Sequence, residues 1–208
     1  MDLFYSFIIA FSMVFFAELG DKTQLLVLSF STKNRAYKIL LGVALGTFFS
    51  HGIAILFGSQ LASFSQASFQ FYLKLFTYFS FILFGIIGFL PKYNSDSSND
   101  SNNKLSFFNK LYHLHLGVIG IVAISIVIGE LGDKTFLASL GLGLEYPLYK
   151  LPLICGSILG MVLSNLLAIF CGKFLSHYLK PSVISLFSNI IFLVFGIFGL
   201  LDLIFSII

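Results

Sequence analysis

The sequence Glu18-Leu19-Gly20-Asp21-Lys22-Thr23 lies between two apolar segments, and it recurs unchanged as Glu130-Leu131-Gly132-Asp133-Lys134-Thr135. An identical six-residue motif in both halves of a chain indicates an internal duplication. Each charged side chain near the centre of a membrane-spanning helix costs about 2.5 to 3.5 kcal/mol on insertion scales. The motif charges must therefore pair with one another, bind something, or lie near a membrane surface.

The composition around the motifs is that of an integral membrane protein. Of 208 residues, 58% are hydrophobic and 10% are charged, and the mean hydropathy is +0.98, whereas a soluble domain has about 25% charged residues. At about 20 residues per crossing, the chain has room for six helices and short loops. The net charge of +3 is small and scattered, which excludes a nucleic-acid surface as a partner. The apolar segments predict helices at residues 3–30, 39–62, 71–90, 114–142, 151–175 and 183–206.

The duplication extends beyond the motifs. Gly42 and Gly46 reappear as Gly156 and Gly160, and small residues with this spacing are interpreted as packing positions between membrane helices. Cys155 and Cys171 are likewise interpreted as packing residues. We therefore predict an all-α, polytopic membrane protein with two three-helix repeats. The first repeat covers residues 1–90 and the second covers 114–208, and a flexible polar linker joins them at 91–113.

Three crossings per repeat would place the second repeat in the membrane upside down relative to the first. The loops after the first, third and fifth predicted helices carry most of the basic residues, which are Lys33, Arg35, Lys38, Lys92, Lys104, Lys110, Lys173 and Lys180, against Lys74 and Lys150 on the other side. Because basic loops stay in the cytoplasm, we expect a cytoplasmic linker and both termini outside or in a lumen. The first apolar segment has no basic region before it and no cleavage site, so it is expected to be retained.

The four motif acids are the candidate site. On a helix, Glu18 and Asp21 share a face, as do Glu130 and Asp133. If the two copies meet, four carboxylates and two lysines give a net charge of −2, which suits one divalent cation. Such hard oxygen ligands favour Ca²⁺, Mn²⁺ or Mg²⁺ over Zn²⁺ or Cu⁺. Gly20 would also allow the helix to unwind locally.

Neighbouring polar residues are expected to support this site. Hydroxyl or amide oxygens that could complete a ligand shell belong to Thr23, Thr135, Gln24, Ser50, Ser164 and Asn165. Lys22 and Lys134 would hold the geometry of the acids. His51 corresponds to Asn165 in the repeat, and it is a ligand, a proton relay or a packed imidazole. His113 and His115 are interpreted as interfacial. Because closely spaced carboxylates also bind protons, protons and cations would compete for one site, as in an exchanger.

The duplicated motif resembles that of the small cation/proton antiporter family of Golgi Gdt-type transporters and their bacterial and thylakoid relatives, over the whole chain. The resemblance implies six or seven helices in two inverted halves, Ca²⁺ or Mn²⁺ transport against protons, and a role as acidic ligands for Glu18, Asp21, Glu130 and Asp133. The second copy departs from the family pattern, because Leu131 and Phe136 stand where many relatives have Trp and Gln.

The predicted function is export of a divalent cation from the cytoplasm in exchange for protons, with Mn²⁺ first and Ca²⁺ second. No cofactor and no enzymatic activity are expected. The expected location is a bacterial inner membrane or a cyanobacterial plasma or thylakoid membrane. Four alternatives remain: structural Glu–Lys salt bridges, an intramembrane aspartyl protease that uses Asp21 and Asp133, an exporter of a small organic cation or amino acid, and a passive channel.

Overall fold

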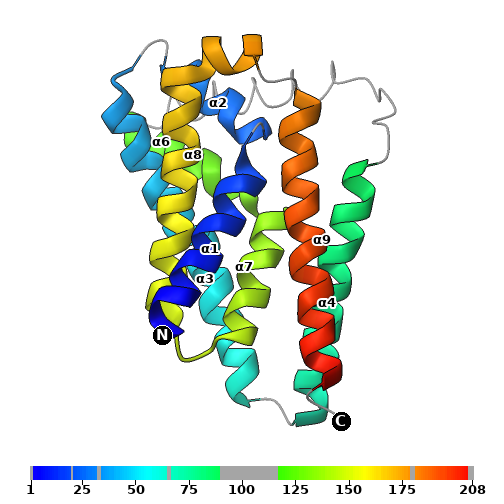
Figure 1. Ribbon diagram of the computed structural model, residues 1–208. Coiled ribbons are helices and arrows are strands. Elements are labelled where there is room, and N and C mark those ends of the chain that lie inside the picture. Colours follow the sequence, from blue (N-terminus) through cyan, green and yellow to red (C-terminus); the bar gives the residue numbers. More distant parts are fainter. Residues whose placement is uncertain are drawn as a thin grey trace.

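The computed structural model describes residues 2–19, 21–31, 34–64, 67–89, 117–178 and 181–205, and within these ranges it contains helices and no strand (Figure 1). The helices are α1 (Asp2–Glu18), α2 (Lys22–Ser31), α3 (Ala36–Phe64), α4 (Ala67–Phe89), α6 (Val118–Glu130), α7 (Lys134–Glu145), α8 (Lys150–Tyr178) and α9 (Pro181–Phe205). The predicted all-α class is confirmed. The predicted linker at 91–113, with His113, lies outside the described residues, as does His115.

The helices predicted at 3–30 and 114–142 are not continuous, which corrects that prediction. Each is broken within the motif, so that α1 and α6 end at a glutamate and α2 and α7 begin at the motif lysine. The same turn closes both breaks, because the Asp21 amide donates to the Glu18 carbonyl at 3.2 Å and the Asp133 amide donates to the Glu130 carbonyl at 3.0 Å. Gly132 has a φ of +81°, which favours glycine and cannot continue a right-handed helix.

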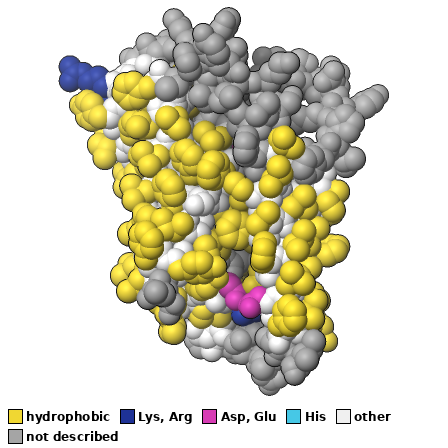
Figure 2. All heavy atoms as spheres, in the orientation of Figure 1, with side chains coloured by type: hydrophobic (Ala, Val, Ile, Leu, Met, Phe, Trp, Pro, Cys, Tyr) yellow, Lys and Arg dark blue, Asp and Glu magenta, His cyan; other side chains and the backbone are white. Residues whose placement is uncertain are grey.

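Two described helices are long and apolar enough by themselves to cross a membrane. They are the segments Ala36–Ser63 of α3 and Lys150–Phe170 of α8, with hydropathies of 2.0 and 2.2. The broken pairs α1–α2 and α6–α7 are divided into shorter pieces by the motifs. Large apolar side chains such as Phe57, Phe79 and Phe198 are exposed on the outer surface, and the face in Figure 2 is largely hydrophobic. Such an exposed apolar surface is typical of a lipid-facing protein.

The two halves of the chain are interleaved. The most extensive helix pairs are α1 with α8, α4 with α9, and α3 with α7, α6 and α8 (Figure 1). Each of these pairs joins a helix from residues 2–89 to one from residues 117–205. Neither half therefore forms a separate bundle, and the ends of α1 and α6 are brought into one interior.

Close backbone contacts at glycines hold these pairs together. A Cβ atom added to Gly46 of α3 would lie 2.7 Å from the Ala123 carbonyl oxygen of α6. In the repeated position, a Cβ atom added to Gly160 of α8 would lie 2.7 Å from the Phe11 carbonyl oxygen of α1. The glycines one turn earlier, Gly42 and Gly156, make contacts of the same kind. The interpretation of these four glycines as packing residues is confirmed.

A polar contact ties the end of α7 to α4. The Tyr78 hydroxyl donates to Glu145 Oε2 at 2.5 Å, and Lys74 Nζ lies 3.0 Å from the same oxygen. Tyr78 and Glu145 border a cavity of about 290 Å³ that is also lined by Tyr5, Tyr146 and Asp202. Figure 2 shows acidic side chains gathered in a hollow at the end of the molecule that carries the termini.

We predict that Gly46→Ala lowers the free energy of unfolding by about 1 to 3 kcal/mol, because the methyl group would collide with the α6 backbone. Gly52→Ala in the same helix is the matched control, since its Cβ would meet only Phe48 Cδ2 at 3.9 Å. Thermal unfolding of the purified variants in detergent measures both effects. Equal melting temperatures for the two variants would contradict the close contact.

Candidate functional site

The helix breaks place four acids in the protein interior. Glu18 and Glu130 are the last residues of α1 and α6, and both are buried, with 0% and 1% exposure. Asp21 and Asp133 follow within the breaks and are half-buried. The prediction that Glu18 and Asp21 lie together is confirmed, but a turn after the end of α1 brings them together and not the face of a continuous helix.

Acids from both copies of the motif converge. One carboxylate oxygen each from Glu18, Asp21 and Asp133 can be chosen so that all three lie within 4.8 Å of one another. Oxygens bound to one cation at about 2.3 to 2.6 Å are separated by at most about 5 Å. Three carboxylates from two halves of the chain are therefore close enough to share a single cation.

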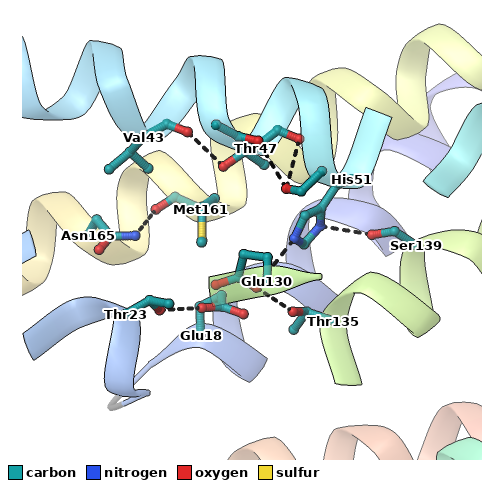
Figure 3. A network of polar contacts seen from close by, with 12 residues as sticks. Glu18, Thr23, Val43, Thr47, His51, Glu130, Thr135, Ser139, Met161 and Asn165 are labelled. Carbon is teal, nitrogen blue, oxygen red and sulfur yellow. Dashed lines mark hydrogen bonds and ion pairs between the residues drawn. The ribbon is translucent and has the colours of Figure 1, made fainter. Parts of the chain in front are cut away.

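A repeated hydrogen bond orients the two glutamates. The Thr23 hydroxyl donates to Glu18 Oε2 at 3.1 Å, and the Thr135 hydroxyl donates to Glu130 Oε2 at 2.9 Å. Figure 3 shows these two pairs side by side, with both glutamates from the ends of their helices. Each threonine directs one carboxylate oxygen. The other oxygen of Glu18, Oε1, is buried and has no hydrogen-bond partner.

Three of the predicted supporting residues lie on α2 and α8. Gln24 Nε2 donates to the Ser164 hydroxyl at 2.5 Å and to the Ser164 carbonyl oxygen at 3.1 Å. Asn165 Nδ2 donates to the Met161 carbonyl at 2.9 Å, while its Oδ1 is buried without a partner. The second motif has Phe136 in place of Gln24, so this amide contact occurs in one half of the chain.

The Ser50 hydroxyl is oriented by its own helix. It donates to the Gly46 carbonyl oxygen at 3.0 Å, as a buried serine on a helix often does. A hydroxyl that donates its proton still has lone pairs on its oxygen, so the expectation that Ser50 contributes to a ligand shell stays a prediction.

The motif lysines do not form the structural salt bridges considered as an alternative, as far as their side chains are described. Among the described residues, no ion pair joins Lys134 to Glu130 or Asp133, although its charge acts on both. The side chain of Lys22 lies outside the described part. Lys134 therefore contributes a nearby positive charge, without a described salt bridge to the acids of its own motif.

His51 reaches the second glutamate from α3. Its Nδ1 lies 2.9 Å from Ser139 Oγ of α7, and its Nε2 lies 3.6 Å from Glu130 Oε2 (Figure 3). Sequence reasoning included His51 but missed Ser139. The signal was present, because Thr135 and Ser139 are four residues apart and so share one face of an otherwise apolar helix.

Comparison with known proteins agrees with this chemistry. The family described as divalent cation/proton antiporter GDT1 matches residues 6–96 and 118–205, one segment in each half. The chain belongs to the GDT1 family. The resemblance inferred from the duplicated motif is therefore confirmed. GDT1 proteins are membrane-embedded transporters, so the prediction that the chain is not an enzyme is also confirmed, and the protease alternative has no support.

The curated relatives are chloroplast proteins of plants. GDT1-like protein 2, chloroplastic, of Oryza sativa subsp. japonica is 24% identical over 210 residues, which cover 92% of this chain and 59% of the relative. Protein PAM71, chloroplastic, of Arabidopsis thaliana is 25% identical over 219 residues, covering 94% of this chain and 56% of the relative. The chain thus spans less than two thirds of these GDT1 relatives. No solved structure is significantly similar to it.

We predict that Gly132→Ala destabilises the protein by about 1 kcal/mol, because alanine is strained at a positive φ, and that it weakens divalent-cation binding by moving Asp133. Gly129→Ala is the matched control at the end of α6, where the added Cβ would meet Thr23 Cγ2 at 3.5 Å, an ordinary contact. Melting temperature with and without Mn²⁺ measures both properties. If both variants show the same Mn²⁺-dependent stabilisation, the backbone at Gly132 does not position the acids.

Proposed function

We propose that this chain is a secondary antiporter that exports a divalent cation from the cytoplasm in exchange for protons, with Mn²⁺ as the first candidate and Ca²⁺ as the second. The observation that carries the proposal is the convergence of Glu18, Asp21 and Asp133 from both motif copies. The GDT1 family, described as divalent cation/proton antiporters, supports the same class of substrate.

The exchange would use the same oxygen atoms for both ions. Glu18, Asp21, Glu130 and Asp133 bind the cation as carboxylates. When the cation leaves, the closely spaced negative charges repel one another in a medium of low dielectric constant, so protons bind in its place. Thr23 and Thr135 keep the glutamates oriented through either state, because a hydroxyl can donate to a carboxylate or accept from a carboxylic acid.

The proposed topology has six crossings in two inverted three-helix repeats. The crossings are α1–α2, α3, α4, α6–α7, α8 and α9. α1 has 17 residues and α2 has 10, so only the two together reach the roughly 20 residues of one crossing. Helices broken at a central ion site are common in transporters with inverted repeats. The basic loops support a cytoplasmic linker. The proposed location is a bacterial inner membrane or a cyanobacterial plasma or thylakoid membrane.

Transport in proteoliposomes tests the proposal. With an imposed pH gradient, vesicles holding the wild-type protein should accumulate Mn²⁺, and Glu18→Gln should reduce the initial rate by at least about tenfold because it removes one ligand charge without changing shape. Asp202→Asn is the charge-matched control, since Asp202 is an exposed acid on α9 outside the cluster, and it should keep the wild-type rate.

Two results would contradict the proposal. Flux of Mn²⁺ and Ca²⁺ that does not respond to the pH gradient would indicate a channel. Equal rates for Glu18→Gln and wild type would remove the carboxylate assignment. The same assay run with Ca²⁺ in place of Mn²⁺ ranks the two cations.

A further inference from the structure

His51 presents a buried nitrogen atom to the acid cluster. The residue lies within α3, has 0% exposure, and extends toward the end of α6 (Figure 3). Its Nε2 is buried without a hydrogen-bond partner, because the nearest carboxylate oxygen, Glu130 Oε2, is 3.6 Å away. That distance is too long for a hydrogen bond. Buried polar atoms are seldom left unsatisfied in folded proteins, so this nitrogen is missing a partner.

Ser139 fixes the orientation of the imidazole ring. The distance of 2.9 Å between Ser139 Oγ and His51 Nδ1 is that of a hydrogen bond. When Nδ1–H donates to the serine oxygen, the lone pair is on Nε2 and points toward Glu130. A hydrogen bond to the second ring nitrogen is how metal-binding histidines are usually oriented.

The gap between His51 and Glu130 has the size of a shared cation. Two ligand atoms bound at about 2.0 to 2.5 Å from one metal ion, at angles of about 90 to 110°, lie roughly 3 to 4 Å apart. The separation of 3.6 Å between Nε2 and Oε2 falls in this range. In the tautomer with the proton on Nδ1, Nε2 and Glu130 Oε2 are two acceptors that repel across this gap, and a cation between them removes the repulsion.

A second unsatisfied atom belongs to the acid cluster. Glu18 Oε1 is buried without a partner, and Glu18 is one of the three acids whose carboxylate oxygens converge. The charges of Glu18 and Asp133 both act on His51, so the imidazole lies within electrostatic range of the acid cluster. The candidate ligands near His51 are therefore carboxylate oxygens and one ring nitrogen.

We propose that His51 Nε2 is a ligand of the transported cation and that this nitrogen, held by Ser139, makes the site prefer Mn²⁺ over Ca²⁺. The inference rests on the proposed antiport function and names its substrate more narrowly. Ca²⁺ is bound by oxygen ligands. Mn²⁺ also accepts oxygen ligands, but as a transition-metal ion it binds an imidazole nitrogen more readily than Ca²⁺ does. An all-oxygen site would have to separate the two ions by size and coordination number alone.

Comparison of the two repeats shows that the imidazole of His51 has no counterpart at the matching position of the second repeat. The position of His51 is occupied by Asn165 in the second repeat, and that of Ser139 by Val27 in the first. Val27 is buried and apolar, so it cannot orient a ring. The duplicated site thus has an imidazole on one side and an amide on the other.

Pulsed electron paramagnetic resonance of bound Mn²⁺ tests the ligand directly. The wild-type protein with Mn²⁺ should show coupling to ¹⁴N, which changes to ¹⁵N coupling after labelling with ¹⁵N-histidine. A variant that retains His51 as its one histidine, with Asn at positions 113, 115 and 177, should keep the coupling, and His51→Asn should lose it. Absence of nitrogen coupling in wild-type protein that binds Mn²⁺ would overturn the proposal, even if His51→Asn fails to fold.

Competition transport tests selectivity. His51→Asn should weaken apparent Mn²⁺ affinity by about tenfold or more and change Ca²⁺ affinity by less than about threefold. Ser139→Ala should shift the Mn²⁺-to-Ca²⁺ ratio in the same direction, and Ser139→Thr should restore it by replacing the hydroxyl. Ser125→Ala is the matched control, because the buried Ser125 hydroxyl donates to the Ile121 carbonyl of its own helix at 2.7 Å.

Two different results would overturn the role of His51 and the antiport function. Wild-type exchange of both ions, with an unchanged Mn²⁺-to-Ca²⁺ ratio in His51→Asn, would overturn the nitrogen ligand and leave the antiporter intact. Failure of the wild-type protein to move either ion against a pH gradient would overturn the antiport function itself.

Discussion

The close approach of helix backbones at glycine residues is the constraint on which the site depends. Gly46 brings α3 against α6, and Gly160 brings α8 against α1. Because α6 and α1 end at the two buried glutamates, these crossings decide where the carboxylates lie. Any side chain larger than hydrogen at the crossings would push the helices apart, and the acids from the two halves would no longer meet.

The six-residue motif supplies ligands and the backbone that presents them. Because the helices end at Glu18 and Glu130, the residues that follow are not restricted to the side-chain directions of a continuous helix. The following turn, closed by the aspartate amide, places a second carboxylate beside the first. A single short sequence therefore supplies the charges and the helix end that presents them in both halves of the chain.

The sequence predicted the helical class from its composition, and the exact internal match predicted that acids of the two motif copies meet, as Glu18, Asp21 and Asp133 do. The role of all four motif acids as ligands stays a prediction. It allowed local unwinding at Gly20 but placed the motifs within continuous helices, since the apolar segments on either side are equally compatible with one long helix. The sequence also missed Ser139, whose partner His51 is 88 residues away in the chain.

The contact between Glu145 and α4 shows how far the two copies have diverged. Glu145 accepts a hydrogen bond from Tyr78 and pairs with Lys74, whereas the matching position in the first repeat is Lys33. The two repeats therefore carry opposite charges at matching sequence positions. In the second repeat, Glu145 lines a cavity together with three tyrosines and draws α7 against α4. Divergence at this one position has thus given the second repeat a helix contact whose acidic partner is absent from the matching position of the first.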